Sequence, residues 1–150
     1  MKDVIVAKFG GSSLADSRQF AKVKKIVESD ARRRYIIPSA PGKRDKKDHK
    51  ITDLLYMCQQ LAAHELSFDE VYCIIEKRYK DICEDLDLHF GIDDILNDVR
   101  EKIQRGASRD YAASRGEYLN AIILSHYLNY EFIDAAELVL FDKRGKFDPE

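Results

Sequence analysis

Long apolar runs are absent from the sequence: none approaches the roughly 20 residues needed to span a bilayer. The first residues also lack the long apolar region of a secretory signal, so we expect no membrane segment and a cytoplasmic location. An excess of either charge is missing too, since 25 Lys and Arg residues face 27 Asp and Glu residues, a formal net charge of −2. Nucleic-acid-binding proteins carry a clear basic excess, so nucleic acid is not an expected partner.

Cysteine is scarce, and the three copies, Cys58, Cys73 and Cys83, are odd in number and form no CxxC pair. All three fall in helix-like segments, which predicts buried or half-buried free thiols without a metal or redox role. The four histidines share no metal-ligand spacing, and no HExxH motif occurs. The sequence therefore identifies no metal ligand.

The 150 residues that are present suffice for one ordinary domain, and 45% of them are hydrophobic. An apolar, β-branched run at residues 4–9 predicts a buried central strand that stops at glycine. Apolar residues at helical spacing predict a helix over residues 16–33, and residues 35–37 predict a second strand. Together they form a strand–helix–strand unit of the parallel type.

The spacing of apolar residues predicts that the chain after the second strand is mainly helical. We expect a helix opening at Thr52 or Asp53, a second behind the capping-box pattern of Ser67 and Glu70, and a third ended by Gly106. Further predictions are a helix after Ser108, a strand and a short helical turn over residues 131–138, and a helix start at residues 148–150. The expected fold is α/β, with an inserted helical layer, and the chain looks truncated.

The glycine turn Gly10-Gly11 between the first strand and the first helix is the strongest local signal. It lets the backbone approach a ligand, so that N–H groups and a helix end can hold a phosphate, with Lys8 pointing into the same crevice. Neither GxGxxG nor GxxxxGK[ST] is present. A tight turn beside a solvated lysine remains the alternative interpretation.

Two further positions are candidates for ligand contacts. Gly116 lies inside a helix, where glycine costs about 1 kcal/mol relative to alanine, which suggests close packing or ligand approach. Glu117 beside it can bind an ammonium group or can be an ordinary solvent-facing glutamate.

Hydroxyl groups mark the other side of the predicted crevice. Ser39 follows the second strand and Thr52 lies near a helix start, where they can bind carboxylate or phosphate oxygens or, for Thr52 or Asp53, cap the helix. The lysine-rich loop of residues 41–50 can steer an anion or be a solvated, mobile loop.

The segments Lys8-Phe9-Gly10-Gly11-Ser12-Ser13, Thr52-Asp53-Leu54-Leu55 and Ser114-Arg115-Gly116-Glu117 occur in an order that resembles the amino-acid kinase family, specifically the aspartokinases. Ile37-Pro38-Ser39-Ala40 and Phe132-Ile133-Asp134-Ala135 extend the resemblance over nearly the whole chain. It implies a parallel-sheet sandwich of the carbamate kinase-like type. It also implies a cytoplasmic enzyme of lysine, threonine and methionine biosynthesis, a homo-oligomer that uses ATP and Mg²⁺ to phosphorylate the side-chain carboxylate of L-aspartate.

The resemblance also implies roles for single residues. Lys8 matches a lysine that stabilises the transferring phosphoryl group, and Gly10, Gly11 and Ser12 match a phosphate-facing turn. Ser39 and Thr52 match hydroxyls of the substrate pocket, and Glu117 matches the acid that holds the aspartate amino group. Positioning and charge neutralisation of this kind are what phosphoryl transfer needs.

Two departures from the family pattern bear on the interpretation. Pro38 replaces a usual strand-forming aliphatic residue, and the family's R-G-G-S-D segment is absent. Residues 1–150 then correspond to the N-terminal, substrate-binding part, without the nucleotide-binding half or the regulatory ACT domains. Alternatives are a kinase of glutamate, acetylglutamate, carbamate or UMP, or a non-catalytic chain that binds a ligand or partner.

Overall fold

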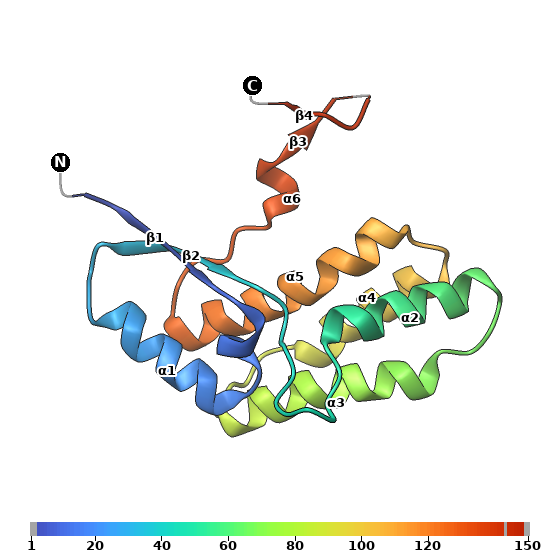
Figure 1. Cartoon of the computed structure of the whole chain (residues 1–150), viewed down its shortest axis with the longest axis horizontal. Coiled ribbons are helices and arrows are strands. Elements are labelled where there is room, and N and C mark those ends of the chain that lie inside the picture. The colour runs from blue at the N-terminus through green and yellow to red at the C-terminus, as the bar shows by residue number, and fades with distance from the viewer. Residues whose placement is uncertain (1–2, 143, 149–150) are drawn as a thin grey trace.

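The predicted strand–helix–strand unit forms the N-terminal part of the molecule (Figure 1). A computed structural model describes residues 3–142 and 144–148 of the chain. β1 (Ile5–Phe9) and β2 (Arg33–Pro38) pair in parallel, and α1 (Ser17–Glu28) connects them. The side chain of Asp16 caps α1 by accepting a hydrogen bond from the Gln19 N–H. α1 ends earlier than predicted because Arg33 already belongs to β2, where it is paired with Ile5.

Only one face of the β1–β2 sheet is covered, so the prediction of a buried central strand is wrong. Ala7 and Ile36 pack against the core, whereas Val6 is 62% exposed and its partner Tyr35 is 56% exposed. An apolar run cannot by itself distinguish a strand buried on two faces from one buried on a single face. Among the described residues the molecule is therefore an α/β fold in which a small parallel sheet forms one layer over helices.

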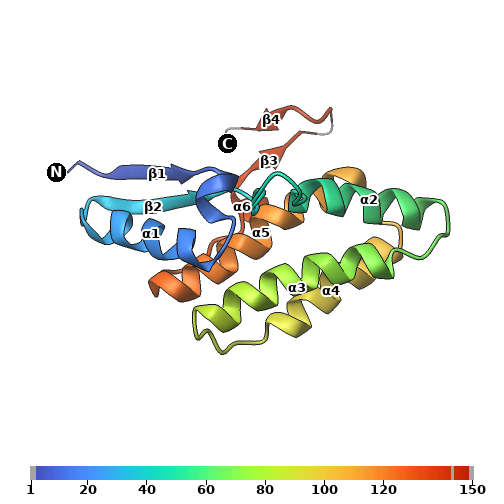
Figure 2. The same cartoon turned by 60° about the horizontal axis from the view of Figure 1, so that its bottom comes forward.

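Four helices make the rest of the core: α2 (Ile51–Ala63), α3 (Asp69–Asp85), α4 (Ile92–Gln104) and α5 (Arg109–Leu128). α5 runs beneath β2, with α3 and α4 on its far side, and it packs against α1, α2, α3, α4 and β2 (Figure 2). Its consecutive residues Ile122, Ile123 and Leu124 are all buried, as expected for a helix with neighbours on several sides. The predicted inserted helical layer is confirmed.

Some of the helix ends follow local sequence signals. Ser108 caps α5 by accepting from the Tyr111 N–H, and Gly106, with φ +88°, follows the end of α4 as predicted. The predicted capping box of α3 is wrong, because Phe68 occupies the cap position and Ser67 bonds to Asp69 instead.

The C-terminal segment extends away from the helices (Figure 1). The strand predicted at residues 131–134 is not formed: Phe132 packs edge to face on Tyr118 of α5, with ring centroids 5.6 Å apart. The short helix α6 (Ala135–Leu138) confirms the predicted turn, and β3 (Leu140–Phe141) and β4 (Phe147–Asp148) form an unpredicted antiparallel hairpin. Asp148 therefore ends a strand, and the other two residues of the predicted helix start, 149 and 150, lie outside the described residues.

Within residues 3–142 and 144–148, no helix combines the length and apolar character that crossing a membrane would need.

Candidate ligand pocket at the strand ends

A pocket of about 490 Å³ lies where β1 and β2 end. The carboxyl ends of parallel strands are the usual place for ligands in open α/β sheets. Its walls come from η1 (Gly11–Leu14), the loop between β2 and α2, the first turn of α2, and α5. The lining residues are Gly11, Ser12, Ser39, Ala40, Pro41, Gly42, Lys43, Lys50, Thr52 and Glu117.

Two glycines allow the walls to meet. The N–H of Gly42 donates to the carbonyl of Gly11 over 2.9 Å. A Cβ on Gly11 would lie 2.8 Å from the Ala40 carbonyl oxygen, and a Cβ on Gly42 would lie 2.7 Å from the Gly11 carbonyl carbon. Neither position can carry a side chain unless the backbone moves. The closeness of η1 and the loop after β2 therefore depends on both glycines.

A third glycine, Gly116, brings the wall formed by α5 close to Ala40. A Cβ on Gly116 would lie 2.6 Å from the Ala40 Cβ and 3.6 Å from a methyl group of Thr52. The interpretation of Gly116 as a close-packing residue is thus confirmed. Because α5 approaches so closely, the next residue, Glu117, lines the same pocket as Ser12 and Thr52.

Buried side chains fix the backbone behind the pocket. The Tyr79 hydroxyl donates to the Gly116 carbonyl over 2.9 Å. Burial raises the pKa of this phenol well above its ordinary value, and the nearby Glu117 carboxylate adds to the shift. The Asn120 amide donates to the Ser39 carbonyl over 2.6 Å. Both groups are neutral donors at physiological pH. Tyr79 holds α3 to α5, and Asn120 holds α5 to the end of β2.

Five of the residues singled out from the sequence meet in this pocket: Gly11, Ser12, Ser39, Thr52 and Glu117. They come from parts of the chain that are up to about a hundred residues apart, so only the fold brings them together.

Lys8 and Gly10 are not among the lining residues. Lys8 is exposed and pairs in register with Ile37, which is 48% exposed, so it lies on the uncovered face of the sheet. A Cβ on Gly10 would meet no atom within 4 Å. The proposed approach of a ligand to Gly10 has room, although no neighbouring atom requires a glycine there.

Two local expectations need correction. The glycine turn leads into the four-residue helix η1, and not directly into α1, whose N-terminus is already capped by Asp16. The helix end that follows the glycine turn, and that was expected to help hold a phosphate, is therefore the start of η1. α2 begins at Ile51 with Lys50 at its cap position and no side-chain cap, so neither Thr52 nor Asp53 serves as a simple N-cap.

The lining combines groups of both charges with hydroxyls. Lys43 and Lys50 supply two cationic side chains, Glu117 supplies one carboxylate, and Ser12, Ser39 and Thr52 supply hydroxyls. Lysines and hydroxyls bind carboxylate or phosphate oxygens, whereas a carboxylate binds an ammonium group. A small zwitterion that carries an additional anionic group fits such a set.

Metal ligands do not gather in the part of the chain that the structure describes, which contains no group of three or more His, Cys, Asp or Glu side chains able to hold a metal ion. The pocket itself offers one carboxylate, Glu117. These residues alone do not form a Mg²⁺ site.

The sequence interpretation missed Arg78 and Asn120, the two buried residues that are polar or charged among those described. Arg78 lies in the apolar stripe of Ile75, Tyr79 and Ile82, and a charged residue in such a stripe was the available signal. Asn120 lies between Leu119 and Ile122 in α5 in the same way.

The fold is of the α/β class, and a pocket lined by charged and hydroxyl groups lies at the ends of its two parallel strands. No family model matches the chain. Aspartokinase 3 of Bacillus subtilis (strain 168) is 35% identical to it over 136 residues, which are 87% of this chain and 30% of that protein. The chain is a homologue of the aspartokinases.

Solved structures agree with that relationship. The aspartate kinase of Clostridium acetobutylicum is 58% identical, with a TM-score of 0.95 over 97% of this chain and 34% of its own. Aspartokinase III of Escherichia coli, solved with aspartate and ADP, has a TM-score of 0.75 over 99% of this chain and 35% of its own. At 23% identity the latter shows the shared fold alone. The chain spans about a third of the length of the relatives it matches.

Proposed function

We propose that the pocket binds L-aspartate and that the protein catalyses its ATP-dependent phosphorylation to 4-phospho-L-aspartate. The observation that supports this most is the convergence of Gly11, Ser12, Ser39, Thr52 and Glu117 on one pocket in a homologue of the aspartokinases. In the reaction, a side-chain carboxylate oxygen attacks the γ-phosphorus of ATP. The new O–P bond forms as the bond to the bridging oxygen breaks, and ADP leaves.

Each wall of the pocket has a role in this proposal. Glu117 pairs with the substrate ammonium group, and the hydroxyls of Ser39 and Thr52 donate to carboxylate oxygens. Lys43 and Lys50 neutralise negative charge that the substrate and the phosphoryl group bring together. Reactions of this type need positioning and charge neutralisation more than a protein nucleophile, and the lining supplies both.

We further propose that residues 1–150 are the N-terminal, substrate-binding part of an amino-acid kinase domain of the carbamate kinase-like type. The nucleotide-binding half and the ACT regulatory domains would then correspond to the remaining two thirds of the relatives' length. Mg²⁺ accompanying ATP, a homo-oligomeric state and a cytoplasmic location belong to the same proposal.

Replacement of Glu117 by Gln in the full-length enzyme tests the proposal. Loss of the charged partner of an ammonium group that binding desolvates costs about 2–5 kcal/mol, so the KM for aspartate should rise by about 30-fold or more. The KM for ATP should change little, because Glu117 is proposed to contact only the amino acid. Steady-state kinetics with each substrate varied separately measure both constants.

The matched control is Glu84→Gln, because Glu84 is an exposed glutamate of α3 that does not line the pocket. Both KM values should stay near those of the unmodified enzyme in this variant. If Glu117→Gln raises both constants equally, or neither, Glu117 is a solvent-facing residue and the pocket is not the aspartate site.

A further inference from the structure

We propose that Arg78 of α3 is a positioning residue of this site: it ties the pocket loop, residues 39–50, to the helices beneath. The pocket loop provides Ser39, Gly42, Lys43 and Lys50 of the lining, whereas Arg78 itself does not line the pocket. The inference rests on the proposed function insofar as it concerns substrate binding.

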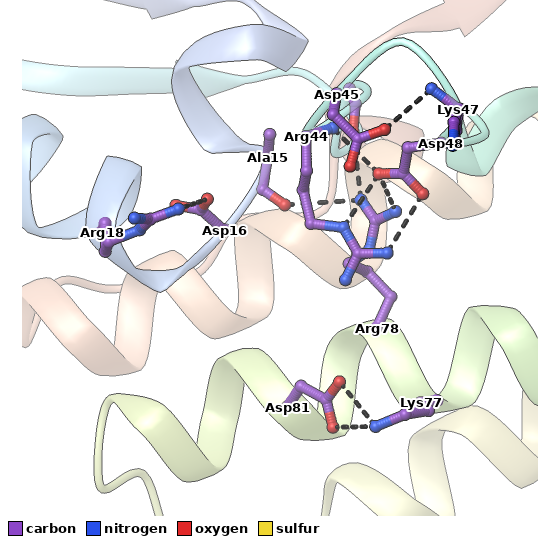
Figure 3. Close-up of polar contacts among 11 residues, drawn as sticks. Ala15, Asp16, Arg18, Arg44, Asp45, Lys47, Asp48, Lys77, Arg78 and Asp81 are labelled. Carbon is purple, nitrogen blue, oxygen red and sulfur yellow. Dashed lines mark hydrogen bonds and ion pairs between the residues drawn. The ribbon is translucent and has the colours of Figure 1, made fainter.

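The contacts of Arg78 join three segments of the chain (Figure 3). One terminal nitrogen donates to the Asp48 carboxylate over 2.5 Å. The other donates to the carbonyls of Gly42 and Ala15, over 3.1 and 3.4 Å. Ala15 directly follows η1, and Gly42 is hydrogen-bonded to Gly11. A single guanidinium therefore fixes the pocket loop relative to η1.

Burial makes this contact unusual for a charged pair. The side chain of Arg78 is 2% exposed and that of Asp48 is 8% exposed. Burial lowers the pKa of Arg78, although an arginine remains protonated at any physiological pH. Replacing a buried ion pair by apolar residues is often neutral or stabilising, so stability alone does not account for this pair. The pair is instead explained by its effect on the pocket loop, whose position it fixes.

Asp48 keeps a second cationic partner inside the loop. Arg44 donates to its carboxylate through Nε at 2.9 Å, through Nη2 at 3.1 Å and through the backbone N–H at 2.9 Å. Together with the Ile51 N–H, which donates to the Pro41 carbonyl over 3.3 Å, these bonds hold the loop's internal conformation. Loss of Arg78 should therefore detach a loop that is still folded.

Detachment of the pocket loop would change the pocket by moving Lys43 and Lys50. Both side chains are exposed and line the pocket from the two ends of the segment that Asp48 anchors. A shift of a positioned charge by about 1 Å can cost on the order of 10²-fold in rate. We therefore expect the Arg78 contact to affect substrate binding without Arg78 touching the substrate.

The test compares Arg78→Met and Arg78→Lys with the control Lys77→Met in the full-length protein. Lys77 is the preceding residue of α3, and its 2.9 Å pair with Asp81 lies on the exposed side of the helix, away from the pocket loop (Figure 3). Limited trypsin digestion followed by mass spectrometry measures the rate of cleavage after Lys43, Arg44, Lys46, Lys47 and Lys50.

Arg78→Met should raise cleavage within the pocket loop at least about tenfold, because loss of a buried ion-pair partner favours local opening. Arg78→Lys keeps the charge but cannot bridge Asp48 and both carbonyls, so an intermediate rate is expected. Cleavage elsewhere should be unchanged, and Lys77→Met should match the unmodified protein. Arg78→Lys remains informative if Arg78→Met does not fold.

The second measurement is the KM for aspartate, which should rise about tenfold or more in Arg78→Met. The denaturation midpoint of Arg78→Lys should stay close to that of the unmodified protein. Unchanged cleavage in both Arg78 variants overturns the proposal, and so does faster cleavage with an unchanged KM. An unmodified protein without aspartate-dependent turnover contradicts the proposed function instead. The cleavage rates then still decide whether Arg78 holds the loop.

Discussion

The positions of Glu117 and Lys8 depend on tertiary contacts that the residue type alone does not predict. Glu117 enters the pocket because Gly116 allows α5 to approach Ala40. Lys8, one residue from the buried Phe9, lies on the uncovered face of the sheet. The role toward a phosphoryl group that we propose for Lys8 therefore requires that the phosphoryl donor bind at the strand ends beside the pocket.

Lys8→Ala in the full-length enzyme should lower kcat by about 10²–10³, the usual effect of removing one preorganised charged donor. The KM for aspartate should change little, because Lys8 does not line the pocket. Steady-state kinetics decide between these effects, with Lys22→Ala on the exposed side of α1 as the control. A normal kcat would make Lys8 a solvated strand residue.

The three cysteines differ in burial, which corrects the expectation that all are at least half-buried. Cys58 and Cys83 are buried and Cys73 is exposed. Burial raises the pKa of Cys58 to about 12, and burial together with Asp93 raises that of Cys83 to about 11. Because the thiolate is the reactive form, both buried thiols are protected at pH 8.

In the folded 150-residue chain, a thiol reagent at pH 8 should therefore react rapidly with one cysteine only. In denaturant all three should react, since burial no longer hinders thiolate formation. The change in absorbance of an aromatic disulfide reagent counts the thiols in each phase. Cys73→Ser should remove the fast phase, and rapid reaction of a second thiol would show that the core around Cys58 or Cys83 opens.

At the scale of elements, α5 organises the site because it contacts every other long helix and β2. Its buried Asn120 holds Ser39, its Gly116 packs on Ala40, and its Glu117 lines the pocket. α3 supports the same site from below through the adjacent residues Arg78 and Tyr79. Periodicity predicted both helices, but it did not identify their buried polar residues, Arg78 and Asn120.

Gly116→Ala should destabilise the protein by about 1–3 kcal/mol, the range for an overpacked core site. The added Cβ would lie 2.6 Å from that of Ala40, and this clash outweighs the gain of about 1 kcal/mol in helix propensity. Urea denaturation measures the change. The double variant Gly116→Ala with Ala40→Gly removes the opposing methyl group and should recover stability relative to the sum of the single changes.

At the scale of the whole molecule, the described residues form one helical core with a two-stranded sheet on one side. The uncovered face of that sheet carries Val6, Tyr35 and Ile37. The chain corresponds to about a third of its aspartokinase relatives. An activity that draws on the rest of their length is therefore not expected from these residues alone.

The purified 150-residue chain should accordingly produce no ADP in an aspartate-dependent manner, whereas the full-length enzyme should. A coupled assay for ADP with and without aspartate measures this, and circular dichroism verifies that the short chain is folded. Aspartate-dependent turnover by the folded short chain at a normal enzymatic rate would contradict the proposed division into substrate-binding and nucleotide-binding parts.

Local signals in the sequence sufficed for the parts that depend on neighbouring residues. Helical spacing predicted α1 to α5, Gly106 and Ser108 marked helix ends, and the glycine turn marked the end of β1. The predicted strand at residues 131–134 failed because a strand needs a partner, and Phe132 packs on α5 instead.

The sequence by itself determined the helices, the parallel strand pair and the residue types that can bind a zwitterionic anion, because propensity, periodicity and turn chemistry act over a few neighbouring residues. Only the tertiary structure decided which of these residues meet. Glu117 lines the same pocket as Ser39 and Thr52 because of the close packing at Gly116, and Arg78 contacts Asp48 from another helix. Such contacts join residues far apart in the chain, and their geometry depends on how the whole core packs.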